Sequence, residues 1–318
     1  MRGIPYMKLV FLDRKSLGSD IDLSPFKRFG EIEMYDFSTP EEVDIRLRDA
    51  DVAIINKSLI NEKTIGNAKN LKLICVTATG INNLDTDYLS NRGIKWRNVA
   101  GYSTESVAQH TFALLFFLYE HLPYYDNYVK TGGYISDTSF THFEKHFHEL
   151  NGKIWGIIGL GSIGKRVAEI ATAFGCHVQY YSTSQSHHDD IFTEVDFETL
   201  IGTSDIISIH APLNKKTERL INRSVFKKMK SSTVLLNLGR GPIINESDLY
   251  DALIRNEIAA AGLDVLCDEP MSVDNPLFKL KDSDRLFITP HIGWAATEAR
   301  QRLMKIIEGQ IQEEFPNM

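Results

Sequence analysis

One stretch near the middle of the chain constrains the fold more than any other. An apolar run from Ile154 to Ile158 precedes glycines at Gly159, Gly161 and Gly164, and a segment with helical periodicity follows. Glycine serves first for a sharp strand-to-helix turn, then for close approach of a pyrophosphate, and last for helix–strand packing. The helix N-terminus offers N–H groups to phosphates. The spacing therefore predicts dinucleotide binding, with a tight turn in another kind of α/β protein as the alternative.

Length and composition exclude several classes of protein. The 318 residues, 43% of them hydrophobic, can form the cores of about two domains. The net charge of −7 argues against nucleic acid or an anionic membrane as a partner. No apolar run approaches the roughly 20 residues of a membrane span, and the N-terminus lacks a signal-peptide pattern. Cys75, Cys176 and Cys267 have neither disulfide nor zinc spacing, so no metal is expected, and the protein is predicted to be soluble and cytoplasmic.

Strand-like and helix-like segments alternate along the whole chain. The expected strands cover residues 7–12, 31–35, 52–55, 71–76, 94–97, 154–158, 176–181, 206–209, 233–237, 259–264 and 286–288. The alternation predicts an α/β fold with parallel sheets, in two Rossmann-like or flavodoxin-like domains. Loops 56–58 and 77–81 would follow the carboxyl ends of strands, where open α/β sheets bind ligands.

A long helix is expected to begin at Ser103 or Thr104 and to end near residues 131–133, and another to run from Thr297 to about Glu313. The aromatic surface of the first of these helices suggests a subunit contact in a homodimer. Internal packing explains it equally well. His110, in the same helix, is interpreted as a packing residue rather than a catalyst.

Three segments place charged residues in apolar surroundings. Arg240 lies between two glycines just past a predicted buried strand, so its guanidinium can pair bidentately with a carboxylate. Glu269 lies in a loop after a strand, and His291 follows a proline in a tight turn. Taken singly, they can equally be a surface turn residue, a solvated acid and a helix-start residue. Together with the glycine turn they fit one mechanism.

These segments carry a family resemblance. Gly159-Leu-Gly-Ser-Ile-Gly164, Leu238-Gly-Arg-Gly241, Asp268-Glu-Pro270 and Thr289-Pro-His-Ile-Gly293 resemble the D-isomer-specific 2-hydroxyacid dehydrogenase family, and the resemblance extends over nearly the whole chain. Within the family, residues 98–111 and 291–295 are most similar to glycerate dehydrogenases, also called hydroxypyruvate reductases.

The resemblance implies a role for each site residue. Arg240 would hold a 2-oxo acid by its carboxylate and carbonyl oxygens. His291 would protonate the carbonyl oxygen as hydride arrives and act as the base in reverse, while Glu269 would orient the imidazole and favour its charged form. The backbone of Thr79 and Gly80 would receive the substrate carboxylate. Residues 1–98 with 291–318 would form the substrate-binding domain and residues 99–290 the NAD(P)-binding Rossmann domain, with the active site in the cleft between them.

The resemblance also implies a cofactor site for NAD. Its expected residues are Thr104, Gly159, Gly161, Ser162, Ile163, Gly164, Ser182, His210, Ala211, Pro212, Leu238, Gly239, Arg240, Asp264, His291 and Gly293. NAD-specific folds usually carry an acid after the second strand, where this chain has Ser182. No Lys or Arg occurs between Arg166 and Lys215 to bind a 2′-phosphate. NAD is therefore expected, with NADP tolerated.

The predicted activity is NAD(P)H-dependent, reversible reduction of a small 2-oxo acid to its D-2-hydroxy acid, with hydroxypyruvate to D-glycerate favoured. The same chemistry on glyoxylate, pyruvate or a bulkier 2-oxo acid is the closest alternative. Formate dehydrogenase is disfavoured, since a glutamine is expected where Glu269 stands. An NAD(H)-sensing protein, like the corepressors related to these dehydrogenases, is a remote alternative.

Overall fold

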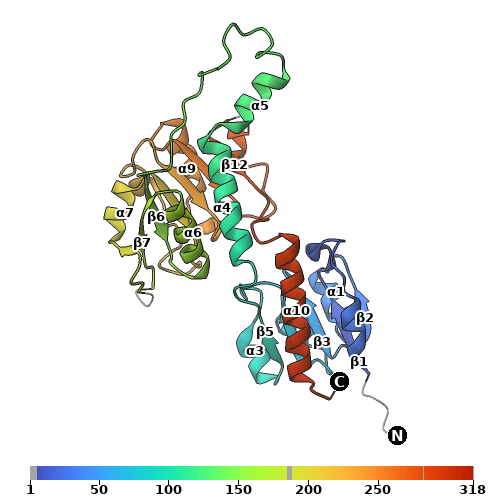
Figure 1. Ribbon diagram of the computed structural model, residues 1–318. Helices are drawn as coiled ribbons and strands as arrows, with labels where there is room; N and C mark the ends of the chain where they lie inside the picture. Colours follow the sequence, from blue (N-terminus) through green and yellow to red (C-terminus); the bar gives the residue numbers. More distant parts are fainter. Residues whose placement is uncertain (1–5, 185–187, 282, 318) are drawn as a thin grey trace. The chain divides into compact units, whose positions relative to one another are not determined.

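The chain forms two compact units. A computed structural model describes residues 6–184, 188–281 and 283–317. The first unit comprises Met1–Ser103 with Ala295–Met318, and the second comprises Thr104–Trp294 (Figure 1). The chain thus crosses between the units twice, in each case a few residues after the boundary expected from the sequence.

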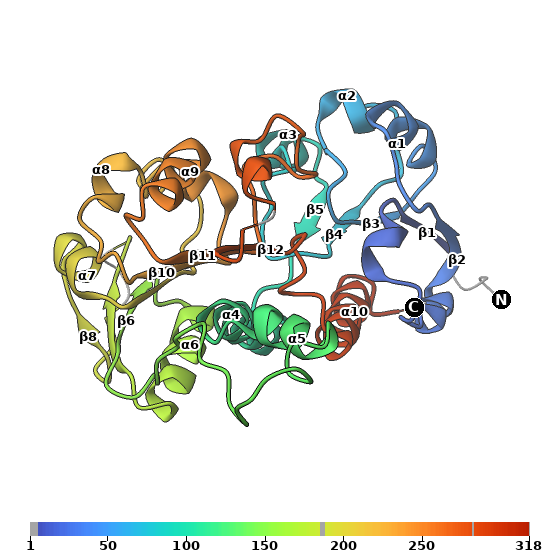
Figure 2. The ribbon, with the colours of Figure 1, turned by 90° about the horizontal axis from the view of Figure 1, so that it is seen from above.

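The sheet of the first unit has five parallel strands in the order β2-β1-β3-β4-β5. These strands are β1 (Met7–Phe11), β2 (Gly30–Met34), β3 (Val52–Ile55), β4 (Leu73–Val76) and β5 (Lys95–Arg97). Helices α1 (Pro40–Arg46), α2 (Glu62–Ile65) and α3 (Thr86–Asn91) cover one face, and α10 (Thr297–Glu314) covers the other (Figure 2). Two short 3-10 helices, η1 (Arg14–Leu17) and η2 (Ser24–Phe29), also belong to this unit.

Sequence chemistry explains these elements. Every residue of β3 and β4 is buried, as expected for central parallel strands covered on both faces. A capping box between Thr39 and Glu42 starts α1, and the Asp85 side chain caps α3 by accepting the Tyr88 N–H.

The second unit has seven parallel strands in the order β12-β11-β10-β9-β6-β7-β8. They are β6 (Ile154–Ile158), β7 (His177–Tyr181), β8 (Thr193–Glu194), β9 (Ile206–Ile209), β10 (Val234–Asn237), β11 (Ala260–Leu263) and β12 (Leu286–Ile288). Strand order runs outward in both directions from β6, so a topological switch point lies between β6 and β9. Ligands of open α/β sheets bind at the carboxyl ends of strands beside such a point.

Helices cover both faces of this second sheet. Helices α4 (Thr104–Tyr119) and α6 (Ser162–Ala173) pack on one face, while α7 (Phe197–Thr203), α8 (Arg223–Phe226) and α9 (Glu246–Ile254) pack on the other (Figure 2). The short helices η3 (Gly241–Ile243) and η4 (Pro276–Leu280) complete the unit. The predicted α/β fold with two parallel sheets is confirmed. Within the described ranges, no helix is both long and apolar enough to cross a bilayer.

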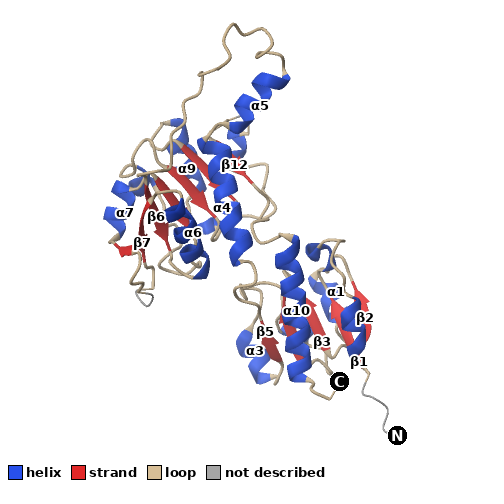
Figure 3. Cartoon of the chain, in the orientation of Figure 1, coloured by secondary structure: helices blue, strands red, loops and turns tan. Residues whose placement is uncertain are grey.

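One predicted element is wrong. The long helix expected from Thr104 to about residue 131 is two helices, α4 and α5 (Leu122–Lys130), separated at His121, whose φ is +51° (Figure 3). Pro123 explains the break, because a proline inside a continuous helix would lack an N–H and clash with the carbonyl of Tyr119. The final helix and the eleven predicted strands are confirmed to within one or two residues at their ends, and the two-residue strand β8 was not predicted.

Candidate functional site

The predicted cofactor residues gather at one edge of the second sheet. Residues 159–164 follow β6, Ser182 follows β7, residues 210–212 follow β9, residues 238–240 follow β10, Asp264 follows β11, and His291 and Gly293 follow β12. Because all these strands are parallel, their carboxyl ends share an edge. Thr104 differs, since it is the first residue of α4.

The glycine turn after β6 fits a dinucleotide. Gly159 has φ +93°, and a Cβ there would lie 2.8 Å from the Ala211 Cα. A Cβ on Gly164 would lie 2.2 Å from the Gly159 carbonyl oxygen, so the helix packs against the turn. Gly161 is the N-cap of α6, has no side-chain cap, and a Cβ there would meet no protein atom within 4 Å. Uncapped N–H groups beside open space suit a pyrophosphate.

His210 lies beside this turn and is electrically neutral. The backbone N–H of His210 donates to the carbonyl of Ile158 at 2.9 Å, which holds the end of β9 against that of β6. Burial lowers the pKa of His210 to about 3. Neither ring nitrogen has a hydrogen-bond partner among the described residues. His210 therefore carries no charge at neutral pH and is no candidate for the catalytic acid.

Arg240 is held by its backbone, and its guanidinium is available. The buried Asn237 side chain accepts the Gly239 N–H at 3.1 Å and donates to the Arg240 carbonyl at 3.0 Å. The Arg240 guanidinium donates to the Gly239 carbonyl at 2.7 Å, and it forms no ion pair with a carboxylate of the described residues. Any side chain on Gly241 would collide with the backbone of Leu266. This packing sets the Arg240 loop against the loop that contains Glu269.

Glu269 and His291 form a hydrogen-bonded carboxylate–imidazole pair at this edge. The His291 Nδ1 lies 2.7 Å from Glu269 Oε2, and Glu269 Oε1 accepts the Leu266 N–H at 3.0 Å. A carboxylate accepts hydrogen bonds only, so Nδ1 bears a proton and Nε2 is the nitrogen left to exchange one with a substrate. The His291 side chain keeps 26% of its surface exposed, which gives it access to solvent protons.

Asp264 fixes the loop that carries His291. Its Oδ1 accepts the Thr289 hydroxyl at 2.6 Å and the Ile292 N–H at 2.8 Å, and its Oδ2 accepts the Gly293 N–H at 2.8 Å. Burial acts to raise the pKa of Asp264, but hydrogen bonds from His110, Thr289 and the two backbone N–H groups outweigh it and hold that pKa below its usual range. Asp264 is thus an ionised anchor at neutral pH.

The first unit holds the other predicted loops in place. The Asn98 amide donates to the Thr79 carbonyl at 2.6 Å, and the Thr79 hydroxyl donates to the Val99 carbonyl at 3.0 Å. Asp13 accepts the N–H groups of all three residues of loop 56–58 at 2.7 to 3.1 Å. The sequence reasoning did not single out Asp13, although an acid just past the first strand was a usable signal.

The structure also places a cation where the sequence indicated none. Lys165, in the first turn of α6, lies 2.7 Å from Asp189 in the segment that follows Ser182. The search for a basic residue between positions 166 and 215 missed it, because the contact comes from the helix before β7. Ser182 itself is buried at the end of that strand.

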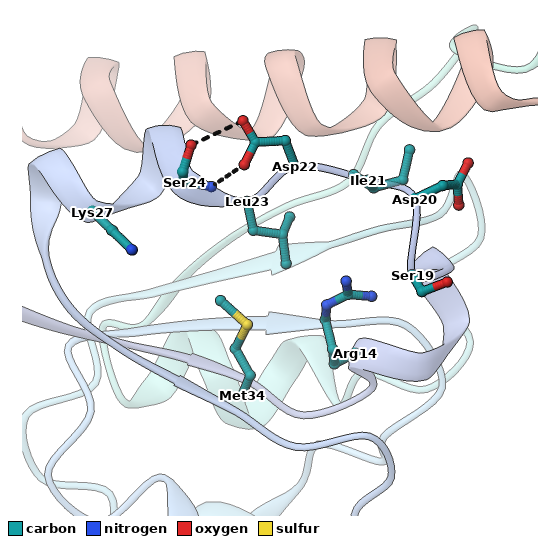
Figure 4. Close-up of a pocket in the computed structure, with 9 residues that line it drawn as sticks. All are labelled: Arg14, Ser19, Asp20, Ile21, Asp22, Leu23, Ser24, Lys27 and Met34. Atoms are coloured by element: carbon teal, nitrogen blue, oxygen red, sulfur yellow. Dashed lines mark hydrogen bonds between the residues drawn. The ribbon is translucent and has the colours of Figure 1, made fainter.

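A surface hollow in the first unit involves none of these residues. Its lining includes Arg14, Asp22, Ser24, Lys27 and Met34 (Figure 4). Asp22 accepts the Ser24 N–H at 2.8 Å and the Ser24 hydroxyl at 2.9 Å, and the Arg14 guanidinium donates to the Gly18 carbonyl. These polar groups are hydrogen-bonded to residues two to four positions away, so we interpret the hollow as a feature of local structure.

Comparisons with known proteins agree with this geometry. Residues 112–293 match the family model described as "D-isomer specific 2-hydroxyacid dehydrogenase, NAD binding domain". The chain is 36% identical over 313 residues to a hydroxypyruvate reductase of Blautia hydrogenotrophica, with 96% of each chain covered. It is 36% identical over 300 residues to a glycerate dehydrogenase of Methylorubrum extorquens, covering 93% of this chain and 92% of the other.

A solved structure extends the match to three dimensions. The D-lactate dehydrogenase of Aquifex aeolicus, solved with NAD and lactic acid, superimposes with a TM-score of 0.83 at 26% identity, covering 98% of this chain and 97% of that one. Sequence and fold therefore agree over nearly the whole length. The chain belongs to the D-isomer-specific 2-hydroxyacid dehydrogenases, a family of NAD(P)-dependent oxidoreductases, and contains the family's NAD-binding domain.

Proposed function

We propose that this enzyme catalyses the reversible, NAD(P)H-dependent reduction of a small 2-oxo acid, with hydroxypyruvate to D-glycerate as the favoured reaction. The observation that carries the proposal is the Glu269–His291 pair at the sheet edge that also bears Arg240, which has no carboxylate partner among the described residues. An acid–base imidazole and a free guanidinium are what reduction of an anionic carbonyl compound requires.

The chemistry then assigns a task to each side chain. The bound nicotinamide supplies the hydride that the carbonyl carbon receives. Protonated His291 donates the proton on Nε2 to the carbonyl oxygen, so the C=O becomes CH–OH and the imidazole becomes neutral. Glu269 keeps the Nδ1 proton in place throughout, at 2.7 Å. In the reverse direction Nε2 accepts the hydroxyl proton.

Arg240 binds the substrate in this proposal. The planar guanidinium donates to one carboxylate oxygen and to the carbonyl oxygen. Within the first unit, the family resemblance makes the backbone of Thr79 and Gly80 a candidate site for a carboxylate, and the Asn98 amide hydrogen-bonds the Thr79 carbonyl there. The preference for hydroxypyruvate and glycerate is supported by one relative named a hydroxypyruvate reductase and one named a glycerate dehydrogenase.

The cofactor preference in this proposal is NADH, with NADPH also used. Ser182 can donate to a ribose hydroxyl and, being neutral, does not repel a 2′-phosphate. Lys165 lies close to the same segment through Asp189 and supplies a cation that a 2′-phosphate can recruit. Three free cysteines fit a reducing compartment, and on that ground we place the enzyme in the cytoplasm.

A homodimer is also part of the proposal. Helix α5 and the irregular segment from 131 to 149 follow one another in the chain (Figure 3). They carry exposed apolar side chains, including Ile135 (88% exposed), Phe140 (87%) and Phe143 (74%). Such a group is typical of a protein–protein interface, and a second copy of the chain is the occupant we propose. Of the long helix on which a contact was expected, we propose the second part, α5, since most of the apolar face of α4 is buried against α6 and the sheet.

The test is an initial-rate panel on the purified enzyme. NADH or NADPH is combined with equal concentrations of hydroxypyruvate, glyoxylate, pyruvate, 2-oxoisocaproate or phenylpyruvate, and the His291→Ala variant serves as the inactive control. Fastest turnover with hydroxypyruvate and NADH is the expected result. Best turnover with a bulky apolar acid would keep the mechanism and overturn the substrate. Tight NADH binding without turnover of any acid would instead favour an NADH sensor.

A further inference from the structure

Two side chains of α4 contact the loop that carries His291, one on either side of that residue. The Ser106 hydroxyl donates to the Gly293 carbonyl at 2.6 Å, and the His110 Nε2 lies 2.9 Å from the Thr289 hydroxyl oxygen. Ser106 and His110 are four positions apart in α4 and so lie on one face of the helix. That face therefore holds the loop from both ends.

The Asp264 carboxylate decides which group donates in the hydrogen bonds that join His110, Thr289 and Asp264. The Thr289 hydroxyl has one hydrogen, and Asp264 Oδ1 takes it at 2.6 Å, because a carboxylate can only accept. The Thr289 oxygen is therefore the acceptor toward His110, and the His110 Nε2 must bear the hydrogen that it donates. Hydrogen bonds thus run from His110 to Thr289 and from Thr289 to Asp264, and the same His110 Nε2 also lies 3.4 Å from Asp264 Oδ1.

The loop needs this support because its backbone is strained. His291 has φ +56°, a left-handed conformation that is unfavourable for a residue with a side chain and persists only when its surroundings enforce it. The Asp264 carboxylate holds the N–H groups of Ile292 and Gly293 just after it. Gly293 packs too closely for a side chain, since a Cβ there would lie 2.8 Å from Asp264 Oδ2 and 3.4 Å from His110 Cδ2.

We propose that His110 is a positioning residue for His291: by donating to Thr289, it fixes the loop that aims the His291 Nε2 at the substrate carbonyl. His110 touches neither substrate nor cofactor in this role. The inference rests on the proposed function, which makes His291 the proton donor. A displacement of about 1 Å at such a donor can cost about a hundredfold in rate.

The test asks whether residue 110 acts by donating a hydrogen bond from the place of Nε2 or only by filling space. The amide nitrogen of glutamine can take the place of a histidine Nε2, whereas that of asparagine takes the place of Nδ1. We expect His110→Gln to keep kcat within about threefold of the wild type. We expect His110→Asn and His110→Phe to lower kcat by 10- to 100-fold. Thr289→Val removes both the acceptor of His110 and the donor to Asp264, so it should lower kcat at least as far as His110→Phe. The double variant should fall well short of the product of the two single effects, because the two substitutions share one interaction.

Two further readouts exclude a general structural defect. NADH affinity, from fluorescence titration, and KM for the best substrate should stay within about threefold of wild type in all His110 variants. In protein labelled with carbon-13 at the histidine Cε1, the His291 signal should shift in the Asn and Phe variants and stay in place in the Gln variant. That signal is assigned by its loss in His291→Gln.

The outcomes separate the two hypotheses. If His110→Phe retains wild-type kcat, or if Gln is as slow as Phe, His110 is not a donor that positions His291. If the wild type turns over no 2-oxo acid, the proposed function fails, yet the His291 signal still reports on the loop. An unmoved signal in both the Asn and Phe variants would then overturn the positioning role on its own.

Discussion

The His291 Nδ1 and the Glu269 Oε2 lie 2.7 Å apart, and the second oxygen of Glu269 is occupied by the Leu266 N–H at 3.0 Å. Glutamine at 269 has one oxygen for two donors, so Glu269→Gln must leave one of them facing an NH₂ group. We expect kcat to fall on the order of 100-fold, within the usual range for impaired acid–base catalysis. Steady-state rates measure this. Asp268→Asn, at the exposed neighbouring carboxylate, is the control and should remain near wild type.

Replacing the guanidinium tests the substrate anchor. Lysine at position 240 keeps the charge but cannot donate two parallel hydrogen bonds, so Arg240→Lys should raise the KM for the 2-oxo acid and lower kcat. We expect kcat/KM to drop by about 100-fold, with NADH affinity nearly unchanged. The same exchange at the exposed Arg255 is the matched control. Kinetics of Arg240→Lys that match those of Arg255→Lys would remove the carboxylate role from Arg240.

The buried Asp264 predicts a pH-dependent contribution to stability. Its pKa in the folded protein is below the usual value, so its stabilisation is complete above the unfolded-state pKa of about 3.9 and is lost as pH falls through the folded-state pKa. At pH 7, Asp264→Asn should destabilise the second unit by about 1–3 kcal/mol, since an amide cannot accept from all the donors. Urea unfolding at pH 7 and pH 3.5 should show the difference shrinking in acid. A constant difference would contradict an ionised anchor.

The residue after β7 should set the cofactor preference. Ser182→Asp adds a carboxylate that can accept from the ribose hydroxyls and repels a 2′-phosphate. We expect KM for NADPH to rise at least about tenfold, with KM for NADH lowered or unchanged. Lys165→Gln tests the opposite contribution and should weaken NADPH more than NADH. Equal effects of Ser182→Asp on both cofactors would place the 2′-position away from Ser182.

Sequence patterns reach far in this chain, for identifiable reasons. Central parallel strands such as β3 and β9 are buried on both faces, so they appear as short apolar runs that are easily located. The glycine turn is equally legible, because Gly159 and Gly164 are constrained by contacts within a few residues or with the adjacent strand. Family likeness adds the roles of Arg240, Glu269 and His291, which remain predictions.

What the patterns missed depends on contacts distant in sequence. The tie between His110 and Thr289 spans 179 positions, and no local rule indicates that a helical histidine meets a loop after β12. The approach of Lys165 to Asp189 likewise depends on how α6 lies beside β7. The break before α5 is different in kind, because Pro123 is a local helix-breaking signal in the sequence itself.

The hydrogen bond between Ser106 and Gly293 shows how the second unit is inserted into the chain. It brings the start and the end of the second unit together, because Ser106 is the third residue of that unit and Gly293 is the last but one. Within the first unit, the Arg302 guanidinium donates to the Tyr102 carbonyl at 3.0 Å. The end of the segment before residue 104 is therefore also held close to the segment that begins after residue 294. Residues 104–294 thus have the form of an inserted domain with adjoining termini. Residues 104–294 can therefore be deleted and the two segments of the first unit joined by a short linker, at little cost in loop-closure entropy.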